Sequence, residues 1–277
     1  RRCGMAFLLL PCWISPRRRT IRMAVEPQWN AQRYAQAASF VPEYGKELVD
    51  LLALKPTDWV LDLGCGDGTL TQYVESSVPQ GGIVGVDHSP EMLEASIYRG
   101  IAVQLADGQS LDYHEEFDKV LSNAALHWMK RDPGAVTRGV YGALKPGGTF
   151  VGELGGSGNV RAVRNALHRA LRRRSYSEAD IQTMDPWYFP SIEEYRQLLE
   201  TAGFSVEAIS LTPRPTAVPA GLESWLLTFV KPFMSIVPQV DSLILEIVNE
   251  VTPTLTASNG ILELDYVRLR FVATKPF

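Results

Sequence analysis

Three glycines at alternate positions follow a run of apolar residues in the segment WVLDLGCGDGTLTQYV, residues 59–74. Gly64, Gly66 and Gly68 stand where a buried strand would end and a helix would begin. Glycine weakens both elements unless the backbone must turn sharply or be approached closely. The pattern therefore predicts a turn on which a nucleotide-like ligand lies against bare backbone. Cys65 lies inside this turn, where a small residue is sufficient, and we interpret it as structural rather than reactive.

Acidic residues mark the ends of three successive strand-like runs. Asp62 belongs to the run before the glycines, and Asp87 ends the next run, GIVGVD. A carboxylate at Asp87 could accept hydrogen bonds from both hydroxyls of a ribose, the alternative being a solvated acid at a strand end. Asp107, in LADGQSL, is placed for the exocyclic amine of an adenine with the backbone of Gly108 and Gln109 nearby, although the Asp-Gly pair could simply form a turn. Together these three acids are more specific than any one of them.

The elements that position these residues alternate between strand and helix patterns. Strands are expected at 59–64, 82–87, 102–107, 117–123 and 148–154, and helices near 69–78, 90–98 and 133–144. Ser89 and Pro90 are typical of a helix start, and Gly100 of a helix end. The LKPGG segment at 144–148 should end the third helix just before the fifth strand. This alternation predicts a parallel sheet with helices on both faces, which brings the strand-end acids to one edge.

The second half of the chain has a different character. We expect a basic helix within 158–174, an amphipathic helix in 191–204 ended by Gly203, and strands at 204–212 and 266–275. Between the last two strands, residues 219–258 look helical and rich in apolar side chains of an exposed type, including Trp225, Phe229 and Phe233. Residues 29–54 also show helical spacing. The prediction is one domain over residues 23–277, with a helical cap at about 219–258.

The glycine pattern distinguishes between two families with this kind of sheet. A dinucleotide fingerprint requires a glycine at the sixth position from Gly64, where this chain has Thr69. The pattern D-x-G-x-G-x-G instead resembles the first motif of class I S-adenosylmethionine-dependent methyltransferases. Further segments resemble the trans-aconitate methyltransferase-like group, to which juvenile hormone acid methyltransferase is related: WNAQRYAQAASFV (29–41), SNAALHWM (122–129), LKPGGTFVGELGG (144–156) and DYVRLRFVATKP (265–276).

The resemblance covers about residues 29–276 and has several implications. It implies a Rossmann-like α/β fold with a seven-stranded, mostly parallel sheet whose last strand is antiparallel. It also implies S-adenosyl-L-methionine as cofactor and a small-molecule acceptor, often a carboxylate, with Asn123 facing the methionine end of the cofactor. Trp29 and Tyr34 would lie on an N-terminal helix closing over the site. The cofactor-binding residues that follow are Trp29, Tyr34, Asp62, Gly64, Cys65, Gly66, Asp87, His88, Met92, Asp107, Gly108, Gln109, Asn123 and Ala124.

Methyl transfer from a sulfonium mainly requires alignment of the two reactants and exclusion of water. A carboxylate acceptor is ionised at neutral pH and needs no general base. The sequence shows no paired acid and base, no metal-ligand set, and no motif for methylation of base amines at SNAALHW. A carboxyl or hydroxyl oxygen is therefore the favoured acceptor. His127 could orient that acceptor, or it could be a structurally satisfied histidine.

Two further groups of side chains have alternative interpretations. The aromatic residues of DPWYFPS, at 185–191, could form a wall of the acceptor pocket, but core packing is the interpretation we favour. Arg161, Arg164 and His168 share one helix face and could attract an anionic substrate, although a solvated face is favoured. A cofactor-binding scaffold without turnover remains an alternative function. A nicotinamide oxidoreductase is disfavoured by Thr69.

Charge and cysteine content exclude other classes. The chain has 27 basic and 31 acidic side chains, and residues 1–22 contain six arginines and no acid. The remainder carries a clear excess of acids, so nucleic acid is disfavoured as a partner. Cys3, Cys12 and Cys65 show no paired spacing, which predicts reduced thiols and no zinc site.

The N-terminal residues 1–22 are expected to lie outside the fold. Their apolar run, MAFLLLPCWI, is too short to span a bilayer, and no other segment is apolar enough. With its arginines the segment could be an organellar transit peptide or a poor signal peptide, or it could be upstream sequence before Met23. The expected location is cytoplasmic, or organellar if the transit peptide is genuine.

Overall fold

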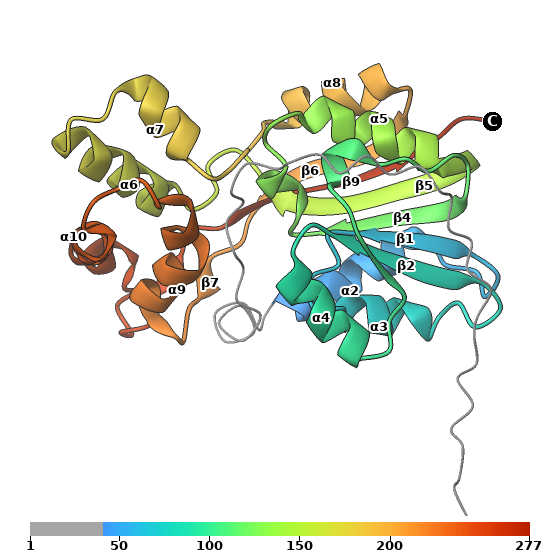
Figure 1. Cartoon of the computed structure of the whole chain (residues 1–277), viewed down its shortest axis with the longest axis horizontal. Coiled ribbons are helices and arrows are strands. Elements are labelled where there is room, and N and C mark those ends of the chain that lie inside the picture. The colour runs from blue at the N-terminus through green and yellow to red at the C-terminus, as the bar shows by residue number, and fades with distance from the viewer. Residues whose placement is uncertain (1–40) are drawn as a thin grey trace, which may run out of the picture.

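The computed structural model describes residues 41–277, and its centre is a seven-stranded sheet (Figure 1). In chain order the strands are β1 (Trp59–Leu63), β2 (Gly82–Asp87), β3 (Val103–Leu105), β4 (Phe117–Asn123), β5 (Leu144–Gly155), β6 (Ser205–Pro213) and β9 (Val267–Thr274). Their order across the sheet is β3-β2-β1-β4-β5-β9-β6. The first five strands are parallel, whereas β9 is antiparallel to both of its neighbours. The expected Rossmann-like fold with an antiparallel last strand is confirmed.

The direction in which the strands are added reverses between β1 and β4. The chain moves outward from β1 to β2 and β3, and then returns to place β4 on the other side of β1. At such a reversal the loops that follow the two central strands diverge and leave a crevice beyond their carboxyl ends. The glycine turn follows β1 at this position, so the topology locates the ligand site where the sequence predicts it.

Helices cover both faces of the sheet (Figure 1). One face carries α2 (Val41–Leu52), α3 (Thr69–Glu75) and α4 (Pro90–Tyr98), and the other carries α5 (Pro133–Ala143) and α8 (Ile192–Ala202). Two short 3-10 helices, η1 (Gly108–Ser110) and η2 (Leu126–Trp128), follow β3 and β4. The expected helix ends are confirmed: the Ser89 hydroxyl accepts a hydrogen bond from the Met92 amide, and Gly203 ends α8 with φ of 107°.

The central strands are apolar because both of their faces are covered. Four of the five residues of β1 are buried. On the α5 and α8 side, Phe150 and Phe271 pack edge to face with ring centroids 4.8 Å apart. On the α2 and α3 side, Leu48 and Val74 pack with residues of β1 and β2. These two cores hold the strand ends in fixed positions around the site.

The LKPGG segment ends α5 after Ala143, as expected, and its residues also form the irregular start of β5. Pairing between β4 and β5 changes from Phe117 opposite Leu144 to Lys119 opposite Thr149. Pro146 lies within the looped-out residues, and since proline has no backbone N–H it cannot donate to a regular ladder.

A helical lobe, here called the cap, projects from one end of the sheet (left in Figure 1). Its elements are α6 (Arg161–Arg173), α7 (Glu178–Met184), β7 (Thr216–Ala217), α9 (Gly221–Phe229), η3 (Lys231–Phe233), α10 (Val240–Leu255) and β8 (Glu263–Leu264). They come from two parts of the chain, one after β5 and one between β6 and β9. The predicted cap segment thus accounts for the second part, and α6 and α7 form the first.

The cap has a hydrophobic core of its own. Trp187, Trp225 and Phe229 are all buried within it, and their rings contact one another. The interpretation of Trp225 and Phe229 as exposed-type residues is therefore wrong. The sequence pattern of one helical segment suggests exposure because it does not show that a second segment, distant in the sequence, packs on it. For Trp187 the structure agrees with the favoured interpretation of core packing.

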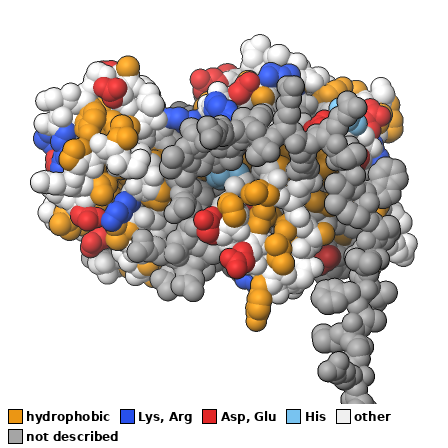
Figure 2. Space-filling view, viewed as in Figure 1, with side chains coloured by type: hydrophobic (Ala, Val, Ile, Leu, Met, Phe, Trp, Pro, Cys, Tyr) orange, Lys and Arg blue, Asp and Glu red, His pale blue; other side chains and the backbone are white. Residues whose placement is uncertain are grey.

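Ion pairs join the two parts of the cap across its surface. Arg169 and Arg173 of α6 bind Glu250 of α10, and Arg173 and Arg174 bind Glu246. Charged side chains of both signs accordingly lie close together on the outer side of this lobe in Figure 2. Each exposed pair adds little stability alone, but the connected set fixes how α6 and α10 align.

Within residues 41–277, no helix combines the length and apolar character needed to cross a membrane. The predictions for residues 1–22, Trp29 and Tyr34 lie outside the described residues.

Candidate active site

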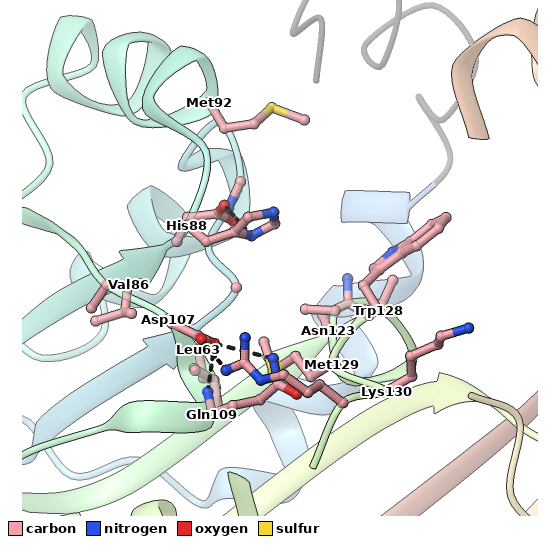
Figure 3. Close-up of a pocket in the computed structure, with 18 of the residues that line it drawn as sticks. Leu63, Val86, His88, Met92, Asp107, Gln109, Asn123, Trp128, Met129 and Lys130 are labelled. Atoms are coloured by element: carbon pink, nitrogen blue, oxygen red, sulfur yellow. Dashed lines mark hydrogen bonds and ion pairs between the residues drawn. The ribbon is translucent and has the colours of Figure 1, made fainter. Parts of the chain in front are cut away.

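A cavity of about 250 Å³ lies beyond the carboxyl ends of β1, β2, β3 and β4. Figure 3 shows His88 and Asp107 across this cavity from Asn123 and Trp128. The lining residues are Leu63, Gly64, Gly66, Val86, Asp87, His88, Met92, Ala106, Asp107, Gly108, Gln109, Asn123, Ala124, Ala125, Trp128, Met129, Lys130, Arg131 and Phe233. All but Phe233 come from the sheet domain, so one residue of the cap completes the wall.

The glycine turn forms the floor of the cavity for two different steric reasons. Gly64 has φ of +80°, and a Cβ atom there would lie 2.1 Å from the Cβ of Ala125. Gly66 has φ of +56°, and a Cβ atom there would meet nothing within 4 Å, so it would project into open space at the cavity. Glycine at the first position allows the loops after β1 and β4 to pack together. Glycine at the second leaves room for a ligand against the backbone.

Asp87 is held rigidly at the end of β2. Its Oδ2 accepts a hydrogen bond from the Gly66 amide at 3.0 Å, and its Oδ1 accepts one from the Ser89 amide at 2.9 Å. Each carboxylate oxygen can accept a second hydrogen bond. The side chain lines the cavity, so it can bind a pair of neighbouring hydroxyls without rearrangement. This arrangement fits a ribose.

Asp107 lies at the next strand end, in a network with Gln109 and Arg131. Its Oδ1 accepts hydrogen bonds from the Gln109 amide at 2.9 Å and from Gln109 Nε2 at 3.2 Å, and its Oδ2 accepts one from Arg131 Nη2. Partial burial acts to raise the pKa of this carboxyl, but these hydrogen bonds outweigh burial and hold the pKa below its usual value. Asp107 is therefore a carboxylate at neutral pH, able to accept from an amine. With Asp87 and the open glycine turn, the cavity fits a nucleoside.

Two residues predicted to bind the cofactor are buried next to the glycine turn and do not line the cavity. Asp62 is buried and accepts a hydrogen bond from the Thr71 hydroxyl at 2.7 Å, and burial raises its pKa to about 6. Cys65 is also buried, and burial raises the pKa of its thiol. A thiol with a raised pKa is a poor nucleophile, which fits the structural interpretation of Cys65.

His127 is also away from the cavity lining. Its ring is buried against those of Trp128 and Phe189, and its Nδ1 accepts a hydrogen bond from the Gly155 amide at 3.2 Å. Burial, reinforced by the charge of Arg268, holds its pKa well below the usual value, so the ring is neutral. Of the two interpretations of His127, the structurally satisfied histidine is the one that this geometry favours.

The side of the cavity nearest the cap is aromatic. Trp128 stacks on Phe233 with ring centroids 5.5 Å apart and planes 7° apart, and it also stacks on Phe229. Sequence reasoning did not assign Trp128 or its neighbours Met129, Lys130 and Arg131 to the cofactor site. The same strand-end rule could have found them, because they follow Asn123 at the end of β4. No comparable signal exists for Phe233, whose position depends on how the cap docks.

A buried charge cluster connects this wall to the cap. Asp185, which follows α7, accepts hydrogen bonds from Arg164 Nε at 2.6 Å and His168 Nε2 at 2.8 Å. Lys130 of the cavity wall donates to carbonyl oxygens at the end of the same helix, including that of Gln182 at 2.9 Å. Arg164 and His168 therefore face a buried acid, and the interpretation of this helix face as solvated or as attracting substrate is wrong for these two residues.

Among the described residues, no three His, Cys, Asp or Glu side chains are grouped as a metal site would require. The histidine and acids at the cavity instead engage neighbouring protein groups, as with His88 Nδ1, which lies 3.5 Å from Asp87 Oδ1.

Comparison with known proteins is consistent with this geometry. Residues 60–148 match the family model described as "Methyltransferase domain". An uncharacterized methyltransferase of Schizosaccharomyces pombe (strain 972 / ATCC 24843) is 39% identical over 259 residues, which is 90% of this chain and 99% of that protein. Trans-aconitate 2-methyltransferase of Mycobacterium sp. (strain KMS) is 33% identical over 193 residues, covering 66% of this chain and 72% of that enzyme.

Solved structures show the same fold at low sequence identity. The YcgJ protein of Bacillus subtilis has a TM-score of 0.60 and 16% identity, covering 85% of this chain and 99% of that one. Phosphoethanolamine N-methyltransferase 2 of Haemonchus contortus, in complex with S-adenosyl-L-methionine, has a TM-score of 0.54 and 14% identity, covering 90% of this chain and 60% of that one. None of these matches supports a nicotinamide oxidoreductase or a scaffold without turnover.

Proposed function

This chain belongs to the class I S-adenosylmethionine-dependent methyltransferases, in the group that includes trans-aconitate 2-methyltransferase, and we propose that it methylates a carboxyl or hydroxyl oxygen of a small molecule. The observation that carries this proposal is the two-sided lining of the strand-end cavity. One side has the carboxylates of Asp87 and Asp107, which suit a nucleoside, and the other has the rings of Trp128 and Phe233, which suit an acceptor.

We propose the following roles for the residues of the cofactor side. Asp87 binds the ribose hydroxyls, and Asp107 accepts a hydrogen bond from the adenine amine. Gly66 has no side chain, so the ligand can contact the backbone there. Asn123 and Ala124, at the end of β4, lie toward the methionine end. When bound, S-adenosyl-L-methionine supplies a methyl group already activated on a sulfonium. The protein therefore contributes position more than proton transfer.

The acceptor side supports an oxygen nucleophile that is ionised before it binds. Among the described lining residues, this side presents aromatic and amide groups and no Asp, Glu or His. The ammonium of Lys130 donates to carbonyl oxygens of Gln182 and Thr183. A carboxylate needs no base at neutral pH, and stacked rings exclude water from the line of displacement. The relative whose name specifies trans-aconitate makes a carboxylate the first class of acceptor to test.

The test is a screen of small carboxylic acids, phenols and amines with methyl-labelled cofactor, followed by mild alkali. A methyl ester releases its label as methanol in alkali, whereas a methyl ether or a methylated amine retains it. We expect alkali-labile label on an acid, or alkali-stable label on a phenol if the acceptor is a hydroxyl. Label that is transferred only to amines, or to none of the acids and phenols, would contradict the proposed oxygen methylation.

Replacement of His127 by glutamine should lower turnover on the best acid by less than about tenfold. The Gln side chain can still accept the Gly155 amide, and the buried ring is neutral with a pKa well below its usual value. A general base typically contributes about 10²–10⁴-fold, so a small effect separates positioning from proton abstraction. The rate should stay nearly flat between about pH 6 and 8, because the acceptor is already ionised.

The measurement is a pH–rate profile of the wild type and His127→Gln on the same acid. A steep rise near pH 6.5 in the wild type that disappears in a variant about a thousandfold slower would make His127 the general base.

A further inference from the structure

We propose that Arg131 is a cofactor-binding residue whose guanidinium covers the adenine of the bound nucleoside. This inference rests on the proposed placement of adenine at Asp107. The observation behind it is that Arg131 lines the same cavity and donates to the oxygen of Asp107 that is best placed for the adenine amine.

The acceptor directions of Asp107 determine where the amine can bind. A carboxylate offers about four lone-pair directions, two on each oxygen. Hydrogen bonds from the amide and Nε2 of Gln109 use both directions of Oδ1. Arg131 uses one direction of Oδ2, so an adenine amine is directed to the same oxygen and lies beside the guanidinium.

The backbone next to Arg131 is held on its C-terminal side. Asp132 donates its amide to Gln109 Oε1 at 2.9 Å, and its side chain caps α5. On the other side the Lys130 ammonium donates to the carbonyl oxygens of Gln182 at 2.9 Å and Thr183 at 3.2 Å. The residues that flank Arg131 therefore both have protein partners.

The side chain itself is exposed and flexible enough to reorient over a ring. Its exposed fraction is 60%, so its ion pair with Asp107 contributes little while water screens it. A planar guanidinium stacks on an aromatic face better than an ammonium does, and the attraction grows as water is removed. Covering the adenine would supply that dry environment and would close the cavity at the end opposite the acceptor.

The test measures the affinities of three ligands for the full chain by calorimetry: S-adenosylmethionine, S-adenosylhomocysteine and 5′-methylthioadenosine. The last retains the adenine and ribose but lacks the amino and carboxyl groups of methionine. Arg131→Ala should weaken all three by the same factor, about tenfold. Arg131→Lys keeps the positive charge but lacks the planar guanidinium, so it should bind the ligands nearly as weakly as Arg131→Ala does.

Arg138→Ala is the matched control. Arg138 has an exposed fraction of 61%, pairs with Asp132 at 3.4 Å, and is not among the lining residues. It should bind all three ligands like the wild type. An equal loss in this control, or a loss below about threefold in Arg131→Ala, would overturn the proposal.

The pattern across ligands and variants tests the rest of the argument. A loss for S-adenosylmethionine without one for 5′-methylthioadenosine would place Arg131 at the methionine end and overturn the proposal. Full recovery in Arg131→Lys would show that only charge matters, which also contradicts stacking. Asp107→Ala, which removes the acceptor, separates this inference from the site assignment. If that variant binds normally, adenine is not at Asp107 and the proposed cofactor site fails, whereas normal binding by Arg131→Ala alone rejects only the role of Arg131.

Discussion

Replacement of Asp87 by alanine is expected to weaken binding of S-adenosylhomocysteine about ten- to a hundredfold. Hydrogen bonds to a charged group contribute about 1.5–3 kcal/mol, and this carboxylate is already fixed by the amides of Gly66 and Ser89. Calorimetry on the folded variant measures the effect. Unchanged affinity would reject the assignment of Asp87 to the ribose.

Loss of Asp87 also removes a hydrogen bond from the glycine turn, so the experiment needs a readout specific for the ribose. The 2′-deoxy and 3′-deoxy forms of the ligand provide it. The wild type should bind both more weakly than the parent ligand, and Asp87→Ala should lose this discrimination. Asp67→Ala is the control, because Asp67 lies in the same turn, binds Thr69 and Arg99, and is not part of the cavity lining. A similar loss in this control would attribute the effect to a loosened turn.

Asp185→Asn is expected to lower the free energy of unfolding by about 1.5–3 kcal/mol, because it replaces a buried carboxylate that accepts hydrogen bonds from Arg164 and His168. The Asp185 side chain is 2% exposed, and its Oδ1 also accepts a hydrogen bond from the Trp187 amide at 3.1 Å. Urea unfolding followed by tryptophan fluorescence should detect the loss, since Trp187 and Trp225 are buried in the cap.

The matched control for this change is Asp241→Asn. Asp241 is also paired with a cation, Lys231, but its side chain is 75% exposed. Its loss should cost no more than about 1 kcal/mol. Equal effects of the two variants would contradict the view that burial makes the Asp185 cluster important.

The cluster also has a defined pH dependence. Burial acts to raise the pKa of Asp185, but the hydrogen bond from His168 and the charge of Arg164 outweigh it and hold the pKa below its usual value. Because the pKa of Asp185 is lower in the folded state, its carboxylate stabilises the folded protein at pH values above the unfolded pKa of about 3.9. This stabilisation is lost as the pH falls through the folded pKa. The stability difference between the wild type and Asp185→Asn should therefore be constant near neutrality and shrink below about pH 4. A difference that persists unchanged at pH 3 would contradict this account.

Local patterns predicted the sheet and the residues at the ends of its strands. Asp87 and Asp107 could be identified because an acid that follows a strand-like run lies at the carboxyl end of that strand. Asp62 was assigned to the cofactor by the resemblance, but it lies within β1, is buried and accepts a hydrogen bond from Thr71. The alternation of apolar and polar residues does not by itself distinguish an acid that lines the cavity from one that is buried beneath it.

Residues whose environment depends on distant segments were not predictable. His127 follows β4 as a site residue would, yet the amide of Gly155, on the neighbouring strand, occupies its Nδ1. Arg164 and His168 share a polar helix face, but their partner is Asp185 in a later loop. Phe233 reaches the cavity only because two separate parts of the chain fold together into the cap. Each of these environments depends on tertiary packing, which the local hydrophobic pattern of the sequence does not predict.

The position of β9 has a consequence for how the protein is synthesised. The strand is the last element of the chain, yet it lies between β5 and β6, and β6 pairs with no other strand of the sheet. During translation β6 emerges well before its partner strand in the sheet, so its backbone groups stay hydrogen-bonded to water until β9 has been synthesised. A chain truncated before Val267 would thus lose two strands from the sheet, and the nascent chain would expose the edge of β5 to its neighbours on the polysome.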